Sequence, residues 1–546
     1  MTKTTLFLFT AGILLLACQH RKKADTIFYN GIVYTVDSAF SAKQAFAVAQ
    51  GRIIATGSDN EILNGFEGEK IDLGKSYVYP GFIDAHCHFY NYGMNLQTVD
   101  LTGTTSFQEV IQKVKAYAND HQTGWIVGRG WDQNDWEIKQ FPEKRAFDSL
   151  FPSRPLILKR VDGHAALVNQ AALNIAGIDE KTKIAGGEIF KEKNHVTGIL
   201  IDNAVELVEK KIPPPDIFQM EQGLLAAQAN CFGVGLTTVD DAGLEKNVVQ
   251  LIDSLQRSGK LKMRIYAMLS PTKDNLSTYL TKGPVIKDLL NISSVKIYAD
   301  GALGSRGACL TMPYSDKPSH TGFLLKPIHY FDSIATVIYK AGFQMNTHCI
   351  GDSANRLILD VYGKTLKGKN DRRWRIEHCQ VVQTSDVPKF GQFSIIPSIQ
   401  TTHATSDMYW AGDRLGKRIS TAYAYKSLLK QNGLIANGSD FPVEDINPLF
   451  GFYAAVVRKD KKGFPKNGFQ VENALSRKEA LYAMTYWAAY ANGEEKQKGS
   501  IEKNKFADFV ILEQDLLKTP DSLLWKIKVK QTWIAGKKRF DRDSKN

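Results

Sequence analysis

Two histidines separated by a single residue are the first feature of this sequence that could carry out chemistry. His86 and His88 lie at the end of the run PGFIDAHCH (residues 80–88), whose apolar start predicts a short buried strand. Because successive side chains of a strand point to opposite faces, the two imidazoles face one side and Cys87 faces the other. Two imidazoles placed in this way can bind one metal ion. A pair of structural histidines at a strand end is the alternative interpretation.

Four more side chains that can bind metals lie at or just after the ends of predicted strands. Lys296 lies in VKIYADG, His348 ends QMNTH, His378 ends WRIEH, and Asp440 follows ANGS. Each has an alternative interpretation. Lys296 could pair with Asp300, His348 and His378 could be structural histidines, and Asp440 could cap a helix. The C-terminal ends of the strands of a parallel barrel meet at one rim. We therefore expect these side chains to converge on a metal centre with the histidine pair.

Eight short apolar runs, separated by helical patterns, would position these side chains. This alternation is typical of βα units around a parallel sheet, and it predicts an α/β fold that is a (β/α)₈ TIM-like barrel. Ser476 and Glu479 form a predicted capping box at the start of the last long helix, residues 478–491. The predicted strands are residues 82–88, 236–240, 264–269, 294–299, 343–348, 374–378, 393–398 and 434–439.

The remaining segments predict two additions to the barrel. Residues 25–79 and 495–546 each contain a few β strands, too few for a separate core, and together they predict one small β-sandwich built from both termini. The barrel would then occupy residues 80–494. Residues 95–225 do not follow the βα rhythm, so we interpret them as an insertion after the first barrel strand. An insertion at this position is expected to cover the active site as a wall or lid.

The first residues have the features of a targeting segment. Lys3 precedes an apolar stretch, residues 6–17, that is too short to span a membrane, so residues 1–17 are predicted to be a signal peptide. The run LLAC is similar to a bacterial lipobox and predicts lipidation of Cys18, with residues 18–24 as a tether. A secretory signal with an incidental cysteine is the alternative. We therefore expect a lipid-anchored protein of the bacterial cell envelope that faces the periplasm.

Length, charge and cysteine content limit the domain count and the partners. The chain has 546 residues, which predicts two or three domains. Its net charge of +12 comes from scattered lysines without a basic stripe, so we expect a basic surface near anionic lipid headgroups and no nucleic-acid partner. Cys87, Cys349 and Cys379 each follow a predicted metal ligand. We expect them to be small buried side chains of the barrel wall and not members of a disulfide framework.

Taken in order, these motifs resemble the amidohydrolase superfamily of metal-dependent hydrolases. Within it, the chain is similar to the exocyclic-amide branch that includes the N-substituted formamide deformylases (amidohydrolase family 3). The resemblance extends over nearly the whole mature chain, and it is much more specific for the superfamily than for a substrate. The motifs that carry it are PGFIDAHCH (80–88), VKIYADGALGSR (295–306), THCIGD (347–352), RIEH (375–378), GSD (438–440) and GSIEKNKFADFVIL (499–512).

The resemblance implies a metal centre with one or two divalent ions. Lys296 would bridge two ions after carboxylation by CO₂, which converts a cation into an anionic oxygen ligand. Mixed nitrogen and oxygen ligands suit zinc best, and manganese or iron would also fit. The implied ligands are His86, His88, Lys296, His348, His378 and Asp440.

The implied activity is hydrolysis of a C–N amide-type bond, exocyclic or linear, in a small-molecule substrate. The metal would activate water, Asp440 would act as general base and then as general acid, and His378 would bind the metal or stabilise the oxyanion. A carbamate, ester or lactone hydrolase on the same site is an alternative. A substrate-binding lipoprotein that has lost catalysis is another, which the complete ligand set disfavours. A homodimer is also among the expectations.

Several side chains outside the ligand set are expected to contact the substrate. The runs GWDQNDW (130–136) and RVDGH (160–164) lie in the insertion and resemble the branch at these places. Core tryptophans and an ion pair between Arg160 and Asp162 are the alternative. The histidine of TTHATSD (401–407) follows the seventh predicted strand and should reach the pocket unless it lies in a surface loop. The expected substrate contacts are Trp131, Asp132, Arg160, His164, Arg306 and His403.

Overall fold

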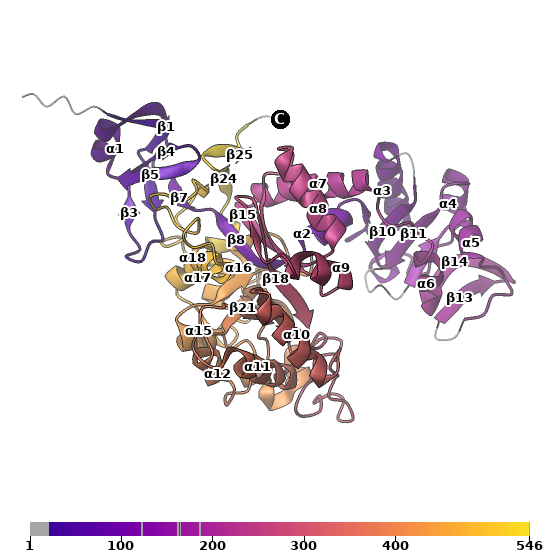
Figure 1. Cartoon of the computed structure of the whole chain (residues 1–546). Helices are drawn as coiled ribbons and strands as arrows, with labels where there is room; N and C mark the ends of the chain where they lie inside the picture. Colours follow the sequence, from indigo (N-terminus) through magenta and orange to yellow (C-terminus); the bar gives the residue numbers. More distant parts are fainter. Residues whose placement is uncertain (1–20, 122–123, 161–162, 164, 185–186, 545–546) are drawn as a thin grey trace, which may run out of the picture.

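A computed structural model describes residues 21–544, except for residues 122–123, 161–162, 164 and 185–186. The predicted signal peptide, Cys18 and His164 therefore lie outside the described residues. Figure 1 shows a barrel in the centre, a β-sandwich at the upper left and a lobe formed by the insertion at the right.

Eight parallel strands form the barrel sheet. In spatial order they are β8 (Phe82–Cys87), β15 (Leu236–Leu244), β16 (Arg264–Leu269), β18 (Leu290–Tyr298), β19 (Gln344–Cys349), β20 (Arg375–His378), β21 (Ile396–Gln400) and β22 (Ala436–Gly438). The first and last strands meet through backbone hydrogen bonds, from Asp440 N to the His86 carbonyl (2.7 Å) and from His88 N to the Phe441 carbonyl (2.8 Å). The α/β barrel is thus confirmed, and each predicted strand corresponds to one barrel strand.

Helices cover the outside of the barrel, and the last of them differ from the prediction. The capping box is present, because Ser476 and Glu479 exchange side chain to backbone hydrogen bonds. The long helix expected over residues 478–491 is instead two helices, because the chain turns at Met484, whose carbonyl accepts a hydrogen bond from Ile83 N of β8 (2.9 Å). The covering helices include α7 (Ile217–Gly233), α8 (Lys246–Arg257), α10 (Ile328–Lys340), α11 (Asp352–Leu366), α12 (Val387–Gln392), α13 (Thr401–Asp407), α14 (Ala411–Leu415), α15 (Tyr425–Asn432), α16 (Pro448–Val457), α17 (Arg477–Ala483) and α18 (Tyr486–Ala491).

Two sheets form the sandwich, and strands from both termini share one of them. One sheet holds β5 (Arg52–Gly57), β4 (Ala45–Ala49), β1 (Lys22–Tyr29) and β6 (Phe66–Asp72). The other holds β25 (Lys537–Asp541), β24 (Val529–Ile534), β23 (Phe509–Leu512), β7 (Tyr77–Pro80), β2 (Ile32–Tyr34) and β3 (Ala42–Lys43). The C-terminal β23 pairs with the N-terminal β7. The ring of Phe28 contacts Phe46, Phe509 and Trp533, so aromatic side chains from both ends of the chain fill the core between the sheets.

The insertion forms a lobe around its own sheet. The strand order is β13 (Gly187–Glu192), β14 (His195–Asp202), β12 (Ala165–Val168), β11 (Leu156–Arg160), β10 (Ile126–Trp131) and β9 (Val99–Asp100). The lobe is connected to the barrel through α2 (Phe89–Asn95) and α7. Its apolar side chains, such as Val110, Ile126 and Leu158, make separate buried clusters, so it does not need the barrel to bury them. Figure 1 shows the lobe set apart from the barrel, so the expected wall or lid is not formed in this arrangement.

The cysteines of the described residues are all free. Cys87, Cys349 and Cys379 are at most 1% exposed, which confirms that they are buried wall residues and not a disulfide framework. Among the helices of the described chain, none is both long enough and apolar enough to cross a membrane.

Candidate metal centre

The predicted ligands converge at the C-terminal ends of the barrel strands. His86 and His88 lie at the end of β8, and Asp440 follows β22 on the other side of the seam. The Oδ1 atom of Asp440 lies 3.2 Å from His88 Nε2 and 3.7 Å from His86 Nε2. The Nζ atom of Lys296, from β18, lies 2.9 Å from His86 Nε2. Strands far apart in the sequence therefore bring four predicted ligands together.

Three further histidines complete the cluster. The ring centroid of His378 lies 4.9 Å from that of His86 and 4.5 Å from that of His348. His403, on α13, has its Nε2 atom 3.8 Å from Asp440 Oδ2, and its ring stacks on His378 at 6.0 Å. His403 therefore lies at the cluster and not in a surface loop.

Two local features bring Asp440 to the histidine pair. Gly438 lies so close to β8 that a Cβ atom there would be 2.3 Å from His86 N and 2.7 Å from Asp84 Oδ1. The Asp84 carboxylate holds the turn, because it accepts hydrogen bonds from Ser439 N (3.0 Å) and Oγ (2.6 Å). Asp440 itself has a left-handed φ of 63°. Such a conformation costs a non-glycine residue roughly 1–3 kcal/mol and persists where the surrounding contacts enforce it.

Hydrogen bonds donated by the Nδ1 atoms orient three of the imidazole rings. His86 Nδ1 donates to Glu377 Oε2 (2.5 Å), and His88 Nδ1 donates to the Ala242 carbonyl (3.0 Å). His378 Nδ1 donates to Gln400 Oε1 (2.7 Å). Because each partner is an acceptor, each Nδ1 carries the proton and each Nε2 is unprotonated, with a lone pair that can bind a metal. Burial lowers the pKa of His86 to about 4 and that of His378 well below its usual value, so both rings are neutral near pH 7.

The donor set fits a divalent metal ion. Buried polar atoms normally have a hydrogen-bond partner. Three in this cluster have none within the described chain: His348 Nε2, His403 Nε2 and Asp440 Oδ1. Two groups of three ligand atoms are compact enough to hold one ion each, and they are His86 with His88 and Asp440, and His378 with His403 and Asp440. Neutral imidazoles with a carboxylate are a typical ligand set for zinc.

Lys296 is buried beside the cluster and is not paired with Asp300. The Asp300 carboxylate instead accepts hydrogen bonds from the backbone N–H groups of Cys309 (2.9 Å), Ile350 (3.0 Å) and Gly351 (2.7 Å). Lys296 forms no ion pair with any carboxylate of the described residues, and its side chain contacts His86. Burial lowers its pKa to about 8, so roughly a tenth of the amine is neutral near pH 7. The alternative interpretation, in which Lys296 is paired with Asp300, is therefore wrong.

A buried network connects His86 to the interior of the barrel. Arg375 Nε lies 2.8 Å from Glu377 Oε1, and Arg375 Nη1 lies 3.0 Å from both Asp240 Oδ2 and Asn492 Oδ1. Burial acts to raise the pKa of Glu377, but the charge of Arg375 and the contact with His86 outweigh it, so the pKa is well below its usual value. An ionised carboxylate on Nδ1 fixes the tautomer of a ligating histidine and raises its basicity.

Three residues that shape this centre were not assigned a role from the sequence: Asp84, Glu377 and Tyr298. Asp84 lies two residues before His86 and Tyr298 two residues after Lys296, so strand alternation could have indicated both. Glu377 precedes His378 directly, and alternation would place the two on opposite faces. The left-handed φ of 74° at His378 breaks that alternation, which the sequence does not signal.

Arg306 lies in the loop that follows β18. Its guanidinium group forms an ion pair with Asp316, at 2.7 Å between Nη2 and Oδ2. Asp316 also pairs with Arg414 of α14, so this carboxylate holds the loop after β18 against that helix. The guanidinium of Arg306 is therefore committed to a structural contact, and its role toward a substrate stays a prediction.

The predicted substrate contacts of the insertion are not brought to the cluster. Trp131 is 1% exposed inside the lobe, and its Nε1 atom donates to the Leu158 carbonyl (2.7 Å). Arg160 Nη2 lies 2.6 Å from Asp132 Oδ1, also within the lobe. Trp131 is therefore a core tryptophan, which is the alternative to a substrate contact that the sequence left open. His164 lies outside the described residues.

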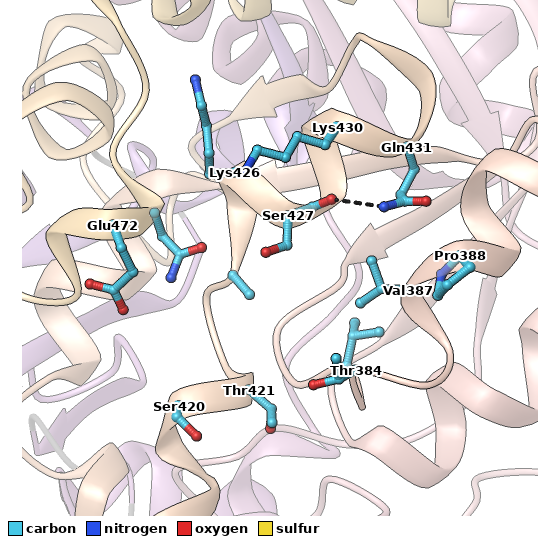
Figure 2. Close-up of a pocket in the computed structure, with 13 residues that line it drawn as sticks. Thr384, Val387, Pro388, Ser420, Thr421, Lys426, Ser427, Lys430, Gln431 and Glu472 are labelled. Carbon is cyan, nitrogen blue, oxygen red and sulfur yellow. Dashed lines mark hydrogen bonds between the residues drawn. The ribbon is translucent and has the colours of Figure 1, made fainter.

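A cavity of about 540 Å³ lies away from the metal centre, between α12, α15 and the short helix η4 (Val471–Asn473) (Figure 2). Thr384, Ser427 and Lys430 are among its lining side chains. None of the lining residues is a predicted ligand, so this cavity does not belong to the metal centre.

Comparisons with known proteins agree with this geometry. A sequence profile described as the Amidohydrolase family matches residues 69–540. "Putative amidohydrolase YtcJ" of Bacillus subtilis is 32% identical over 533 residues, covering 94% of this chain and 99% of that protein. The "N-substituted formamide deformylase" of Arthrobacter pascens is 24% identical over 550 residues, covering 95% of this chain and 98% of that protein. The crystal structure of "an uncharacterized metal-dependent hydrolase" from Pyrococcus furiosus has a TM-score of 0.77 and 28% identity, covering 90% of this chain and 100% of that chain. The chain therefore belongs to the amidohydrolase family, as its motifs predicted.

Proposed function

We propose that this protein is a metal-dependent hydrolase that cleaves a C–N amide-type bond in a small molecule. The observation that carries the proposal is the position of Asp440 between two histidine pairs, His86 with His88 and His378 with His403. The similarity to the N-substituted formamide deformylase supports a formamide or another N-acyl bond as the target.

The side chains of this cluster would hold one or two divalent ions, and zinc suits them best. Such an ion would polarise the scissile carbonyl and lower the pKa of water. The acceptors on the Nδ1 atoms of His86, His88 and His378 orient these rings so that their Nε2 atoms face the position of such an ion.

Asp440 is suited to move the proton. Burial acts to raise its pKa, but the contact with His88 and the neighbouring imidazoles outweigh burial and hold it well below its usual value. The carboxylate is therefore ionised and can accept a proton from the attacking water. It can then return the proton to the leaving amine, as a general base and general acid do in turn.

Lys296 supports a two-ion centre in this proposal. A buried amine with a pKa lowered to about 8 has enough of its neutral form to react with CO₂. The resulting carbamate would supply oxygen ligands beside His86, where the amine now lies at 2.9 Å. Carboxylation of Lys296 is thus part of the proposed active form.

Tyr298 is suited to hydrogen-bond the substrate. Its ring centroid lies 4.9 Å from Lys296 Nζ and 5.5 Å from the ring centroid of His348, and the residue is 38% exposed. Burial raises the pKa of the phenol to about 12, so the hydroxyl keeps its proton. A neutral donor next to the ligands can stabilise negative charge on the carbonyl oxygen of a substrate.

The test is a substrate screen of purified protein whose metal content is measured in the same samples. We expect turnover of N-formyl, N-acyl or ureido compounds, and its loss in Asp440→Asn. Matched esters, carbamates and lactones test the alternative hydrolase, and turnover of these alone would overturn the assignment of the C–N bond. Tight binding of amides without turnover in metal-loaded protein would instead support a binding lipoprotein.

A further inference from the structure

The cavity of Figure 2 has charged, polar and apolar groups on different sides. Lys430 belongs to α15, Glu472 and Asn473 belong to η4, and Val387 and Pro388 belong to α12. Figure 2 shows Glu472 at the left of the cavity, Lys430 at the top, and Val387 with Pro388 at the right. The apolar side chains of α12 therefore lie across the cavity from the carboxylate of η4.

Two charged groups of the lining, Lys430 and Glu472, form no ion pair within the described chain. Lys426 lines the same cavity one helical turn before Lys430, but its Nζ atom contacts both carboxylate oxygens of Glu479, at 2.6 and 2.5 Å. Among the described residues of the lining, one ammonium group and one carboxylate group are thus left without a paired counter-charge. Such a lining is complementary to a ligand that carries one charge of each sign.

Glu472 acts on the buried Arg458 through its charge but forms no ion pair with it. The guanidinium group of Arg458 instead donates hydrogen bonds to the Phe469 carbonyl (2.8 Å) and to Gln470 Oε1 (3.1 Å). The carboxylate of Glu472 therefore remains available to a ligand that enters the cavity.

A buried amide gives an independent indication of a ligand. Asn473 is 6% exposed and lines the cavity, and its side-chain amide forms no hydrogen bond within the described residues. Unlike the unpaired amide of Asn346 in the barrel interior, it is not sealed off inside the protein. Polar side chains that are nine-tenths buried usually have a hydrogen-bond partner, so the partner of this amide is expected in the cavity.

We propose that this cavity binds a small zwitterion with an apolar side chain, that is, an α-amino acid with free amino and carboxyl groups. Lys430 would meet the carboxylate, Glu472 would meet the ammonium group, and the Asn473 amide would hydrogen-bond the ligand between them. The apolar side chain of the ligand would lie on Val387 and Pro388. The site is separate from the metal centre, and the proposal does not depend on the reaction that the metal centre catalyses.

The experiment is calorimetric titration of the metal-loaded full chain with L-leucine and with three analogues that each lack one feature. We expect 4-methylpentanoate, which lacks the ammonium group, and 3-methylbutan-1-amine, which lacks the carboxylate, to bind at least about tenfold more weakly than leucine, as expected for one lost hydrogen bond to a charged group. Glycine keeps both charges but lacks the apolar side chain, and it should also bind more weakly. If 4-methylpentanoate or 3-methylbutan-1-amine bound as tightly as leucine, the zwitterion assignment would be wrong.

Two charge variants locate the bound leucine. Lys430→Gln and Glu472→Gln should each raise the dissociation constant for leucine about tenfold. Glu188→Gln, which alters an exposed glutamate of β13 in the lobe, is the matched control and should leave it unchanged. An amino acid can also chelate a metal ion. Leucine binding that is equal in both cavity variants and the unmodified protein, or that glycine matches, would place the ligand at the metal centre and overturn the proposal.

Asn473→Leu distinguishes a ligand contact from a structural role. The variant keeps nearly the same volume and removes the amide, and it should raise the dissociation constant for leucine about three- to tenfold. Because the amide forms no hydrogen bond within the described chain, the unfolding temperature without leucine should stay unchanged. A lower unfolding temperature together with unchanged leucine binding would make Asn473 a structural residue and overturn the proposal.

Discussion

The Nδ1 atom of His86 and the Oε2 atom of Glu377 lie 2.5 Å apart in the interior of the barrel, where both side chains are fully buried. The other carboxylate oxygen of Glu377 contacts Arg375, which is itself held by Asp240 and Asn492. This series of contacts begins at His86, a predicted ligand, and ends at Asn492, the residue that follows α18. The orientation of His86 depends on contacts made deep inside the barrel, away from the substrate.

Glu377→Gln should weaken metal binding. The amide keeps the volume of the side chain but cannot accept hydrogen bonds from both His86 and Arg375 through two carboxylate oxygens. We expect the dissociation constant for the metal to rise roughly 10–100-fold, as is typical when the partner of a ligating histidine is lost. Because Arg375 would lose a buried counter-charge, the free energy of unfolding should also fall by about 3 kcal/mol. Competition with a chelator and chemical denaturation measure the two effects.

Glu495→Gln is the matched control for this variant. Glu495 pairs with Arg373 at 2.6 Å, at a site remote from the metal cluster. It should change stability slightly and leave the affinity for metal unchanged. If both variants bound metal as the unmodified protein does, the role of Glu377 in orienting His86 would be wrong.

Gly438→Ala should displace Asp440 from the histidine pair. The added Cβ atom would lie 2.3 Å from His86 N, which is backbone of β8 and cannot move aside cheaply. We expect the metal content to fall together with a loss of about 1–3 kcal/mol in the free energy of unfolding, as for other overpacked sites. Gly412→Ala, in α14, is the control, because nothing lies within 4 Å of the Cβ position there. Normal metal content in Gly438→Ala would contradict this account of the seam.

The barrel and most of the cluster were predictable from local patterns. Each βα unit has a short apolar run, and parallel strands end at one rim, so the positions of His86, His348 and His378 follow once the runs are recognised. Asp440 was placed by the same rule, although its side chain reaches His88 only because Gly438 permits the close approach of β22 to β8.

The remaining features depend on tertiary contacts that local patterns do not encode. The break at Met484 arises because β8 uses the carbonyl of that residue. The pairing of Asp300 with three backbone N–H groups depends on the loop after its own strand, β18, and on the turn after β19. The position of the lobe depends on whether it must bury surface on the barrel. It has buried clusters of its own, so its sequence did not determine that it would cover the rim.

Tyr298→Phe should lower kcat while leaving KM and metal content nearly unchanged. The variant keeps the ring beside Lys296 and removes only the hydroxyl that is proposed to stabilise charge on the substrate. Loss of one such donor typically lowers kcat about 10²–10³-fold. Steady-state kinetics on a substrate from the screen measures the effect, with Tyr330→Phe on α10 as the control. An unchanged kcat would remove Tyr298 from the mechanism.

Cys18→Ser should release the protein from membranes if Cys18 carries the lipid. The expectation rests on the run LLAC after a short apolar stretch, since a lipid chain is then what holds the protein at the envelope. Fractionation of cells, with mass spectrometry of the N-terminal peptide, measures both location and modification. Cys309→Ser, which alters a free cysteine of the folded part, should leave the distribution unchanged. Equal membrane association of the Cys18 variant and the unmodified protein would speak against lipidation.

Lys296→Ala should abolish metal binding and activity together. The lysine lies 2.9 Å from His86 Nε2 and forms no ion pair within the described residues. A buried ammonium group without a counter-charge is unfavourable, which argues against a purely structural role for this lysine. If a carbamate on this amine bridges two ions, its removal takes away ligands of both. Added formate or acetate should then restore part of the metal content and turnover, because a short carboxylate can fill the space of the carbamate.

Lys498→Ala separates this outcome from a general effect of removing a buried lysine. Lys498 is 3% exposed and pairs with Glu494 at 2.8 Å, so its loss should lower stability and leave the metal content normal. Mass spectrometry of the intact protein adds a direct readout, because a carbamate increases the mass of the metal-loaded form by one CO₂. Full metal occupancy and near-normal turnover in Lys296→Ala would rule out the bridge. Metal loss without rescue by formate or acetate would leave Lys296 as a residue that positions His86 and not as a ligand.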